Sequence, residues 1–416
     1  MKNLFQLLKK PFFLNITANI FSYFVAFCGS VIYVHLLGKA SFGLYTFSFN
    51  IISMFLLVNG FGAASGVLQY VSRNHDEIIR EDYLRFAFQA GTIFNTAISI
   101  LIILYALFTP LPLKNIKLIL LSMAFFPIGR LYIDVFQAYM RARGENILQA
   151  KFSILNNAII LFLNLIGIVT FNLYGLIYST YIAYGIMFFY SSWKFKLPQL
   201  FRTYKSTRIN SREFISYSFF NTLSNAFSGL LFVLDILIIG YIIKDPKLVA
   251  AYRVATIIPF AINFIPGIIV TYYYPEFAKN AENKNKLRTL VDFIRKRMFL
   301  FSFIVSICLI ILAKPIIFRI FGKAYIDSIL PFQIVSFGYW IIATFRIING
   351  NVLAALGKAK LSFSITSIVL VLNIIITYFM VHYYSINGAA IAVVIVYIIS
   401  STISYIVLKN IIEKIE

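Results

Sequence analysis

The sequence predicts an all-α polytopic membrane protein with about twelve transmembrane helices. Of its 416 residues, 60% are hydrophobic and 12% are charged, whereas soluble globular domains contain about 45–50% apolar and about 25% charged residues. Apolar runs of the roughly 20 residues needed to cross a bilayer follow one another along the chain. Short loops that carry Lys and Arg separate them. These observations exclude a water-soluble fold.

Placing one helix on each apolar run yields twelve spans. The first run is interpreted as a retained span and not as a signal peptide, because no small-residue cleavage site follows it. All loops on the extracytoplasmic side are short, so no outer catalytic domain is expected. The spans are 12–35, 44–71, 86–108, 117–140, 148–170, 174–193, 214–243, 249–274, 298–320, 328–356, 361–382 and 387–408.

The basic residues predict the orientation of these spans. Alternate loops and the two ends of the chain hold 26 of the 37 Lys and Arg residues, and the loops on the opposite side hold 8. The positive-inside rule puts the more basic side in the cytoplasm. Both termini are therefore expected to be cytoplasmic. The net charge of +22 is explained by topology and membrane lipids, and no nucleic-acid partner is predicted.

The sequence offers no catalytic or metal-binding motif. Cys28 and Cys308 lie inside apolar runs, and the three histidines lack the spacing of metal ligands. No phosphate-binding glycine loop, CxxC pair or nucleophile elbow is found. We expect a transporter and not an enzyme, with no cofactor.

An internal repeat divides the spans into two sets of six. A shift of 213 residues places Gly144 on Gly357 and Gly175 on Gly388. Six spans per copy preserve orientation, so the repeat is parallel, which is an arrangement found in transporters with a substrate site between two lobes. The expected lobes are 1–196 and 214–416, joined by a cytoplasmic loop, 197–213.

Six glycine-bearing or turn motifs resemble those of a known family. They are Leu36–Tyr45, Leu234–Gly240 leading to Ala251-Tyr252, Tyr274–Phe277, Phe321–Tyr325, Ala355–Lys358 and Ile386–Ala392. In this order, over nearly the whole chain, they resemble the polysaccharide flippases (Wzx-type, polysaccharide transport family) of the multidrug/oligosaccharidyl-lipid/polysaccharide exporter superfamily.

The resemblance implies a fold and a function. The fold would be the MATE-like fold of that superfamily. The activity would be to flip an undecaprenyl-diphosphate-linked oligosaccharide, as used for O-antigen of lipopolysaccharide, capsule or exopolysaccharide, across the bacterial inner membrane by alternating access. Polymerase or ligase enzymes would then take the product.

Three arginines lie inside spans: Arg130, Arg253 and Arg346. A charge at a helix centre costs roughly 2.5–3.5 kcal/mol on insertion scales, so such residues normally face a cavity or a partner. We interpret Arg130 and Arg346 as ligands of the lipid-linked diphosphate, because a guanidinium holds phosphate oxygens with two parallel hydrogen bonds. The alternative for Arg130 is a local pair with Asp134, four residues later. Arg346 has no acidic residue within a turn.

Asp235 and Arg253 are expected near the outer ends of adjacent spans, where they would pair. The pair either fastens the two helices together or couples flipping to a proton or sodium gradient. The sequence leaves both interpretations open.

Small polar side chains form stripes at helical spacing on two spans. Asn221 and Asn225 belong to the stripe that starts at Ser218, and Asn19 lies on the equivalent part of the first span. They either join helices or line a sugar-binding cavity.

Two other functions are considered. An ion-coupled drug or toxin antiporter of the same superfamily would share the topology, but its cavity should favour carboxylates over arginines. A membrane polysaccharide polymerase also has many spans, yet it requires long outer loops.

Overall fold

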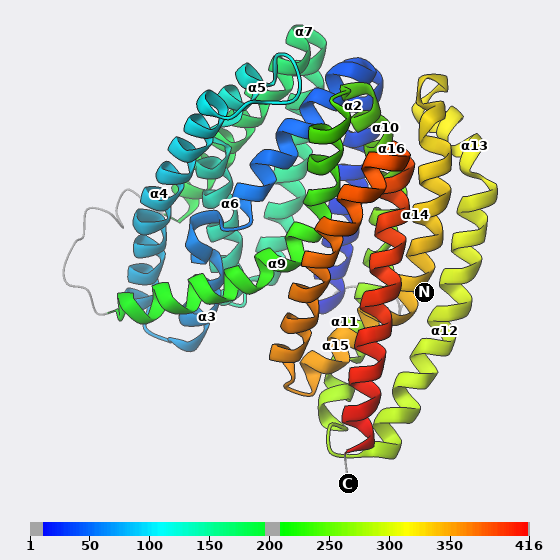
Figure 1. The fold of residues 1–416 in the computed structure, drawn as a ribbon. Coiled ribbons are helices and arrows are strands. Elements are labelled where there is room, and N and C mark those ends of the chain that lie inside the picture. Colours follow the sequence, from blue (N-terminus) through cyan, green and yellow to red (C-terminus); the bar gives the residue numbers. More distant parts are fainter. Residues whose placement is uncertain (1–10, 196–208, 415–416) are drawn as a thin grey trace, which may run out of the picture. The chain divides into compact units, whose positions relative to one another are not determined.

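The computed structural model describes residues 11–195 and 209–414, except for the side chains of residues 11–19, 224 and 359. Within these ranges every regular element is a helix and no strand occurs, as Figure 1 shows. The chain divides into two compact units, Met1–Gly229 (unit 1) and Leu230–Glu416 (unit 2). The expected connecting loop, 197–213, lies largely outside the described residues, and the division falls inside helix α9.

Unit 1 is built from six helices, the first part of a seventh and one 3-10 turn within the described residues. They are α2 (Pro11–Leu56), η1 (Asn59–Gly62), α3 (Ala63–Arg73), α4 (Glu77–Phe108), α5 (Ile116–Met123), α6 (Phe126–Ala142), α7 (Asn146–Lys194) and the beginning of α9 (Ser211–Ile243).

Unit 2 contains the end of α9 and the helices that follow it. They are α10 (Pro246–Ile262), α11 (Phe264–Lys279), α12 (Lys284–Ile311), α13 (Ala313–Ile316), the π-helix η2 (Ile317–Phe321), the 3-10 helix η3 (Lys323–Ser328), α14 (Ile329–Ile341), the π-helix η4 (Ile342–Arg346), α15 (Ile347–Ala355) and α16 (Ala359–Glu413).

These elements account for twelve spans. In the described ranges, eight helices are long and apolar enough to cross a membrane, and nine are counted when α12 and the segment after its 66° bend are one span. Three of them, of 54, 49 and 54 residues, are each long enough for two spans of about 20 residues. Each contains non-helical backbone near its middle, at Gly38, at Phe171 with Asn172, and at Ser385. The expected number of about twelve is confirmed.

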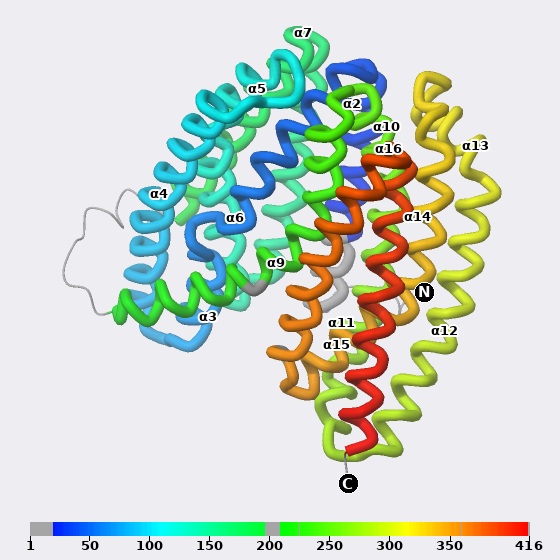
Figure 2. Tube along the Cα trace, viewed as in Figure 1, coloured from blue at the N-terminus to red at the C-terminus, as the bar shows by residue number. Residues whose placement is uncertain are grey.

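Each long element is therefore a helical hairpin. Figure 2 shows α16 turning back on itself, from orange to red. In α7 the two arms meet where Asn164 Oδ1 accepts hydrogen bonds from the hydroxyls of Ser179 (2.7 Å) and Thr180 (3.1 Å). Gly175 lies directly against the backbone of Gly167. Without side chains at these glycines the two arms can approach closely.

The predicted repeat is present in the backbone of the two units. Asn172 (φ 54°, ψ −133°) and Ser385 (φ 54°, ψ −138°) have the same conformation at positions 213 residues apart. Gly388 lies against Met380 as Gly175 lies against Gly167, again with an offset of 213. The two units thus repeat the same hairpin geometry at a constant offset of 213 residues.

The helix ends before the two hairpins are also equivalent. Glu145 N donates to Met140 O at 2.9 Å, and Lys358 N donates to Leu353 O at 2.9 Å. The intervening Gly144 (φ 76°) and Gly357 (φ 71°) are left-handed, as the C′ glycine of a helix terminated by a Schellman motif is. Side chains at φ near +70° are strained, so glycine is favoured here.

The beginning of α9 packs into the core of unit 1. Phe214 is fully buried, and its ring centroid lies 5.6 Å from those of both Tyr70 and Tyr83. Gly62 and Gly66 leave room for the following turn of α9, with its Ser218 and Thr222. This packing explains why the division between the units falls within α9.

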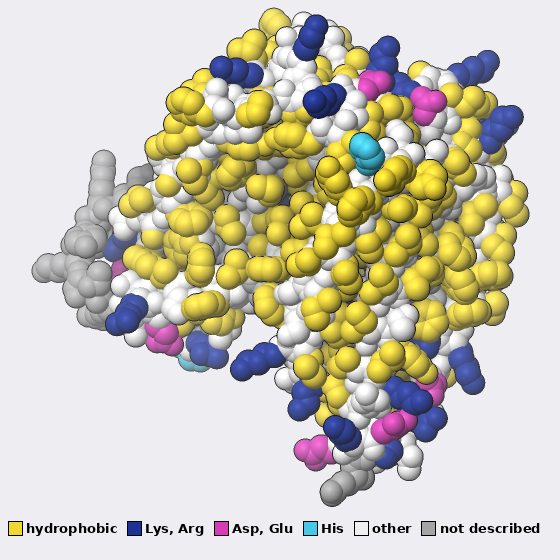
Figure 3. Space-filling model, in the orientation of Figure 1, with side chains coloured by type: hydrophobic (Ala, Val, Ile, Leu, Met, Phe, Trp, Pro, Cys, Tyr) yellow, Lys and Arg dark blue, Asp and Glu magenta, His cyan; other side chains and the backbone are white. Residues whose placement is uncertain are grey.

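The outer faces of the helices are apolar. Figure 3 shows hydrophobic side chains covering the middle of α16, while Lys and Arg gather where α12 begins and α16 ends. Exposed side chains on α16 include Ile374, Tyr378, Phe379 and Tyr383. A soluble protein does not expose such a surface, which is what a lipid bilayer covers.

Candidate functional site

Unit 1 contains an interrupted helix next to polar side chains. Between α2 and α3, the three consecutive residues Gly60 (φ 53°), Phe61 (φ 48°) and Gly62 (φ 85°) all have positive φ. Non-helical backbone at membrane depth is tolerated where protein or a cavity satisfies its polar groups. Asn95 of α4, which is fully buried, does so here by accepting a hydrogen bond from Gly60 N at 2.7 Å.

Asn95 also joins this interruption to the next span. Its Nδ2 donates to Pro127 O at 2.6 Å and to Asn59 Oδ1 at 2.6 Å. Asn59 Nδ2 in turn donates to Asp134 Oδ2 at 3.0 Å. The sequence patterns did not single out Asn59 or Asn95. The sequence Asn-Gly-Phe-Gly inside an apolar run was the available signal, because Asn-Gly pairs favour turns over helix.

Arg130 belongs to the same network. Its Nε lies 3.0 Å from Asp134 Oδ1, so the local pair considered as the alternative for this residue is present. The Arg130 side chain is 46% exposed and that of Asp134 is 28% exposed. The charge of Arg130 is thus balanced within unit 1, although part of the guanidinium faces the surroundings.

Arg346 of unit 2 differs from Arg130 in its partners. It ends the π-helix η4, and its Nη2 donates to Thr366 Oγ1 of α16 at 2.9 Å. Gly350, one turn later, leaves room for the guanidinium. No ion pair of Arg346 is found among the described residues. A π-helix is rare and often marks a functional position in a helix.

Asp235 forms a second polar group in unit 2. Its side chain is 2% exposed, and Tyr252 Oη donates to its Oδ2 at 3.3 Å. Asn373 and Thr377 of α16 approach the same carboxylate. Nevertheless Asp235 Oδ1, Asn373 Oδ1 and Thr377 Oγ1 have no hydrogen-bond partner in the described part of the chain. Unsatisfied buried oxygens of this kind are uncommon.

The expected pair of Asp235 with Arg253 is not among the ion pairs of the described residues. The hydrogen-bond partner is instead the adjacent residue, Tyr252. Neighbouring residues on a helix point about 100° apart, so Tyr252 and Arg253 face different directions. The carboxylate is surrounded by neutral groups.

The stripe of polar side chains on α9 is partly buried and partly accessible. Ser218 is buried against Gly66, Asn221 is half-buried, and Asn225 is exposed. Asn19 lies in α2, but its side chain is outside the described part of the structure. The buried part of the stripe joins helices, and Asn221 and Asn225 remain accessible.

No ligand-like cluster of acidic, histidine and cysteine residues was found in the two described ranges, 11–195 and 209–414. Cys28 and Cys308 are free thiols. Arg130, the partly buried Arg346 and the oxygens around Asp235 are groups with the chemistry to contact a substrate or an ion.

Solved structures with the same fold are transporters. A multidrug resistance MATE family transporter of the MOP superfamily, in an inward-facing conformation, superposes with a TM-score of 0.78 at 15% identity, covering 97% of this chain and 98% of that one. The lipid II flippase MurJ, in an inward closed conformation, superposes with a TM-score of 0.76 at 16% identity, covering 97% and 89%. A Vibrio cholerae MATE transporter has a TM-score of 0.66 at 17% identity, covering 97% of both chains.

The sequence comparisons agree with this fold. No curated protein sequence matches the chain. A family profile described as "Polysaccharide biosynthesis protein" matches residues 8–281, which is more than half of the chain. The resemblance carried by the glycine-bearing turns is thereby confirmed. This multi-pass membrane protein, which has the fold of the MOP-superfamily transporters, belongs to the polysaccharide biosynthesis protein family.

Proposed function

We propose that this protein is a flippase for an undecaprenyl-diphosphate-linked oligosaccharide, the repeat unit of an O-antigen, capsule or exopolysaccharide. It transfers this lipid from the inner to the outer leaflet of a bacterial inner membrane by alternating access of two six-helix lobes. Membership in the polysaccharide biosynthesis family and the fold shared with a lipid II flippase support the proposal.

The environment of Arg346 is the observation that best supports the flippase proposal. This cation lies within a span, with a neutral hydroxyl as its side-chain partner. Such a residue is costly in a bilayer unless it faces a cavity or a partner group. A diphosphate supplies the anion, and a guanidinium binds it with parallel charge-assisted hydrogen bonds. Arg130, half-exposed beside Asp134, provides a second contact that is weakened by its own carboxylate partner.

The sugars require neutral donors and acceptors. Asn221 and Asn225, accessible on α9, and Asn19 on α2 are proposed to contact the oligosaccharide. Both termini and the 197–213 loop are proposed to be cytoplasmic, because the alternate loops hold 26 of the 37 Lys and Arg residues. Polymerase or ligase enzymes on the outer side would consume the product.

Asp235 is proposed to couple transport to an ion gradient. A buried carboxylate with neutral neighbours is destabilised unless it binds a proton or a cation. The unpartnered oxygens of Asp235, Asn373 and Thr377 suit a hard cation such as Na⁺, which prefers oxygen ligands. The same carboxylate could instead carry a proton. Neither role requires an ion pair with Arg253.

The decisive experiment follows the lipid-linked oligosaccharide in cells. Deletion of the gene is expected to trap it on the inner leaflet, and a plasmid copy should release it. An Arg346→Gln copy, expressed at the wild-type level, is expected to restore little transfer. If the deletion causes no accumulation on the inner leaflet, the flippase proposal is wrong.

A drug or toxin antiporter is the second candidate, and the buried Asp235 favours it because cationic drugs bind carboxylates. The two functions predict different effects when a charged side chain is replaced by a neutral one. An antiporter would lose drug efflux in an Asp235→Asn variant and keep it in Arg346→Gln. If the protein is a flippase, deletion of its gene would leave drug sensitivity unchanged, and the lipid-linked oligosaccharide would accumulate.

A further inference from the structure

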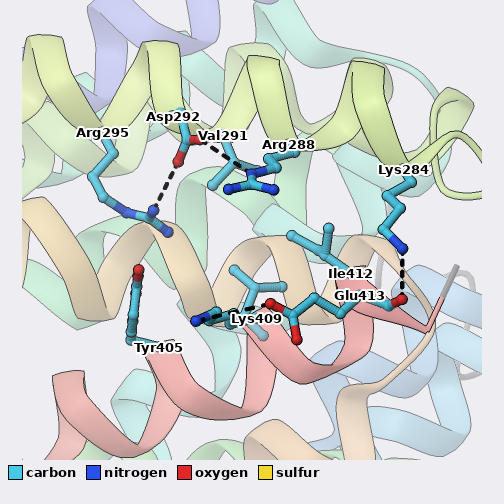
Figure 4. Close-up of a pocket in the computed structure, with 10 residues that line it drawn as sticks. Lys284, Arg288, Val291, Asp292, Arg295, Tyr405, Lys409, Ile412 and Glu413 are labelled. Carbon is cyan, nitrogen blue, oxygen red and sulfur yellow. Dashed lines mark hydrogen bonds and ion pairs between the residues drawn. The ribbon is translucent and has the colours of Figure 1, made fainter.

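A basic pocket lies between α12 and α16 in unit 2, and neither Asp235 nor Arg346 lines it. It encloses about 100 Å³ where α12 begins and α16 ends (Figure 4). Four of its ten lining residues are cations and two are acids, with apolar and aromatic side chains completing the wall: Lys284, Arg288, Arg295, Lys409, Asp292, Glu413, Val291, Tyr405, Leu408 and Ile412. Neither the repeat nor the proposed transport chemistry accounts for this cluster.

Arg295 is more deeply buried than Arg288 and Lys409, which also line the pocket. Its side chain is 16% exposed, and its guanidinium lies over the ring of Tyr405, 5.0 Å from the ring centroid. Nη1 lies 3.1 Å from Asp292 Oδ1, and Nη2 donates to Asn349 Oδ1 at 3.1 Å. Its Nε is buried and has no partner among the described residues. Protein groups therefore fix the orientation of Arg295 without satisfying all of its donors.

The other cations are only loosely paired. Arg288 lies 3.9 Å from Asp292, and Lys409 lies 3.8 Å from Glu413. Arg288 and Lys409 are 71% and 59% exposed, so these pairs contribute little to stability. The four cations exceed the two carboxylates by two charges. Lys284 Nζ donates to the backbone carbonyl of Glu413 at 2.7 Å, which covers the negative end of the α16 dipole.

The pocket opens beside an apolar surface. One turn after Arg295, beyond the exposed Lys296 and Arg297, α12 exposes Phe299 and Leu300. On α16, Tyr405 and Ile406 are exposed. Charged side chains thus meet the membrane-covered surface at this point, as Figure 3 shows for the lower end of these helices. A ligand with an anionic head and acyl chains fits both features. Basic pockets between transmembrane helices bind such headgroups in other membrane proteins.

We propose that this pocket binds the phosphate group of an anionic membrane phospholipid, which bridges α12 and α16. Arg295 and Arg288 donate to the phosphate oxygens, Lys284 and Lys409 supply further positive charge, and the acyl chains lie along Phe299, Leu300 and Ile406. The volume fits a phosphate group, and none of the residues proposed above to bind the transport substrate lines this pocket.

The test uses the full-length protein in lipid nanodiscs and native mass spectrometry to count retained lipids. The Arg288→Gln/Lys409→Gln variant removes two exposed cations from the pocket. The matched control, Lys286→Gln/Lys414→Gln, removes two exposed cations that lie outside the pocket, one on α12 and one directly after α16. Phosphatidylglycerol is the anionic probe and phosphatidylcholine is the neutral one.

We expect the pocket variant to bind phosphatidylglycerol roughly tenfold to thirtyfold more weakly than the wild type. Each cation near a membrane adds to the affinity for an anionic lipid, and the variant lacks two of them. The control should bind it as the wild type does. Phosphatidylglycerol should also raise the melting temperature of the wild type and of the control, and not that of the pocket variant. Phosphatidylcholine should have no such effect on any of the three.

Three results would overturn the proposal. Equal losses in the pocket variant and the control would mean that surface charge alone attracts the lipid. Stabilisation by inorganic phosphate to the same extent would assign the pocket to a free anion. Preferential retention of undecaprenyl diphosphate over phosphatidylglycerol would assign it to the transport substrate.

Discussion

Asn172 and Ser385, which are 213 residues apart, hold the turns of two equivalent helical hairpins in the same backbone conformation. Both have φ 54°, with ψ −133° and −138°. Side chains rarely adopt this region, and residues held there are strained by about 1–3 kcal/mol. The two halves of the repeat therefore retained the geometry of the turn although its residues differ.

Replacement of Ser385 by glycine is expected to stabilise the protein. Relief of strain should exceed the entropic cost of glycine in the unfolded chain, for a net gain of roughly 1 kcal/mol. The melting temperature of purified protein measures the effect. As a control, Ser367→Gly in regular helix of α16 should lower the melting temperature. A decrease of similar size at Ser385 would show that this position is not strained.

Replacement of Gly175 by alanine is expected to destabilise the α7 hairpin. A Cβ there would overlap the carbonyl of Gly167, and overpacking of this kind costs about 1–3 kcal/mol. Gly185 lies on the same helix with open space where a Cβ would lie, so Gly185→Ala should be neutral or stabilising. Thermal unfolding of both variants checks the contrast. Equal melting temperatures would mean that the arms of the hairpin are not in contact.

Loss of the Asn95 side chain is expected to loosen the interrupted helix of unit 1. Asn95→Ala leaves the buried N–H of Gly60 without an acceptor, and an unsatisfied buried group costs about 1–3 kcal/mol. Amide hydrogen exchange at Asn59–Gly62 should accelerate, with a lower melting temperature. Thr96→Ala is the control, because the Thr96 hydroxyl donates only to the carbonyl of Thr92 in its own helix. Unchanged exchange in Asn95→Ala would exclude a supporting role.

Flux of the lipid-linked oligosaccharide is expected to depend on the charge and shape of residue 346. Arg346→Gln should reduce flux roughly tenfold to hundredfold, the equivalent of losing a charged hydrogen bond of about 1.5–3 kcal/mol. Arg346→Lys should retain intermediate flux because it keeps the charge but not the two-pronged geometry. Arg319→Gln, an exposed arginine of η2, serves as the control in reconstituted vesicles. Wild-type flux in Arg346→Gln would remove this residue from the mechanism.

Asp235→Asn is expected to separate transport from its driving gradient. The amide matches the carboxylate in size and accepts the Tyr252 hydrogen bond, but it carries no charge and binds a proton or Na⁺ poorly. Flux in wild-type vesicles should rise when the coupling gradient is imposed, and flux in the variant should not respond. Proton and sodium gradients applied in turn identify the ion. A variant that responds as the wild type does would exclude coupling through Asp235.

The sequence alone determined the number of spans, the repeat and the family. Each depends on local information, because a run of about 20 apolar residues must be helical in a bilayer whatever surrounds it. The Arg130–Asp134 pair was foreseeable for the same reason, since residues four apart meet on one helix face.

Only the tertiary structure decided which side chains surround the buried polar groups. Asp235 meets Tyr252, Asn373 and Thr377 instead of Arg253, and Asn95 joins α4 to Asn59 and Pro127. The beginning of α9 packs on Gly62 and Gly66 in unit 1. Hydropathy places a helix in the membrane but leaves its rotation about its own axis undetermined. That rotation, and with it the partner of each polar side chain, is set by packing between helices distant in the sequence.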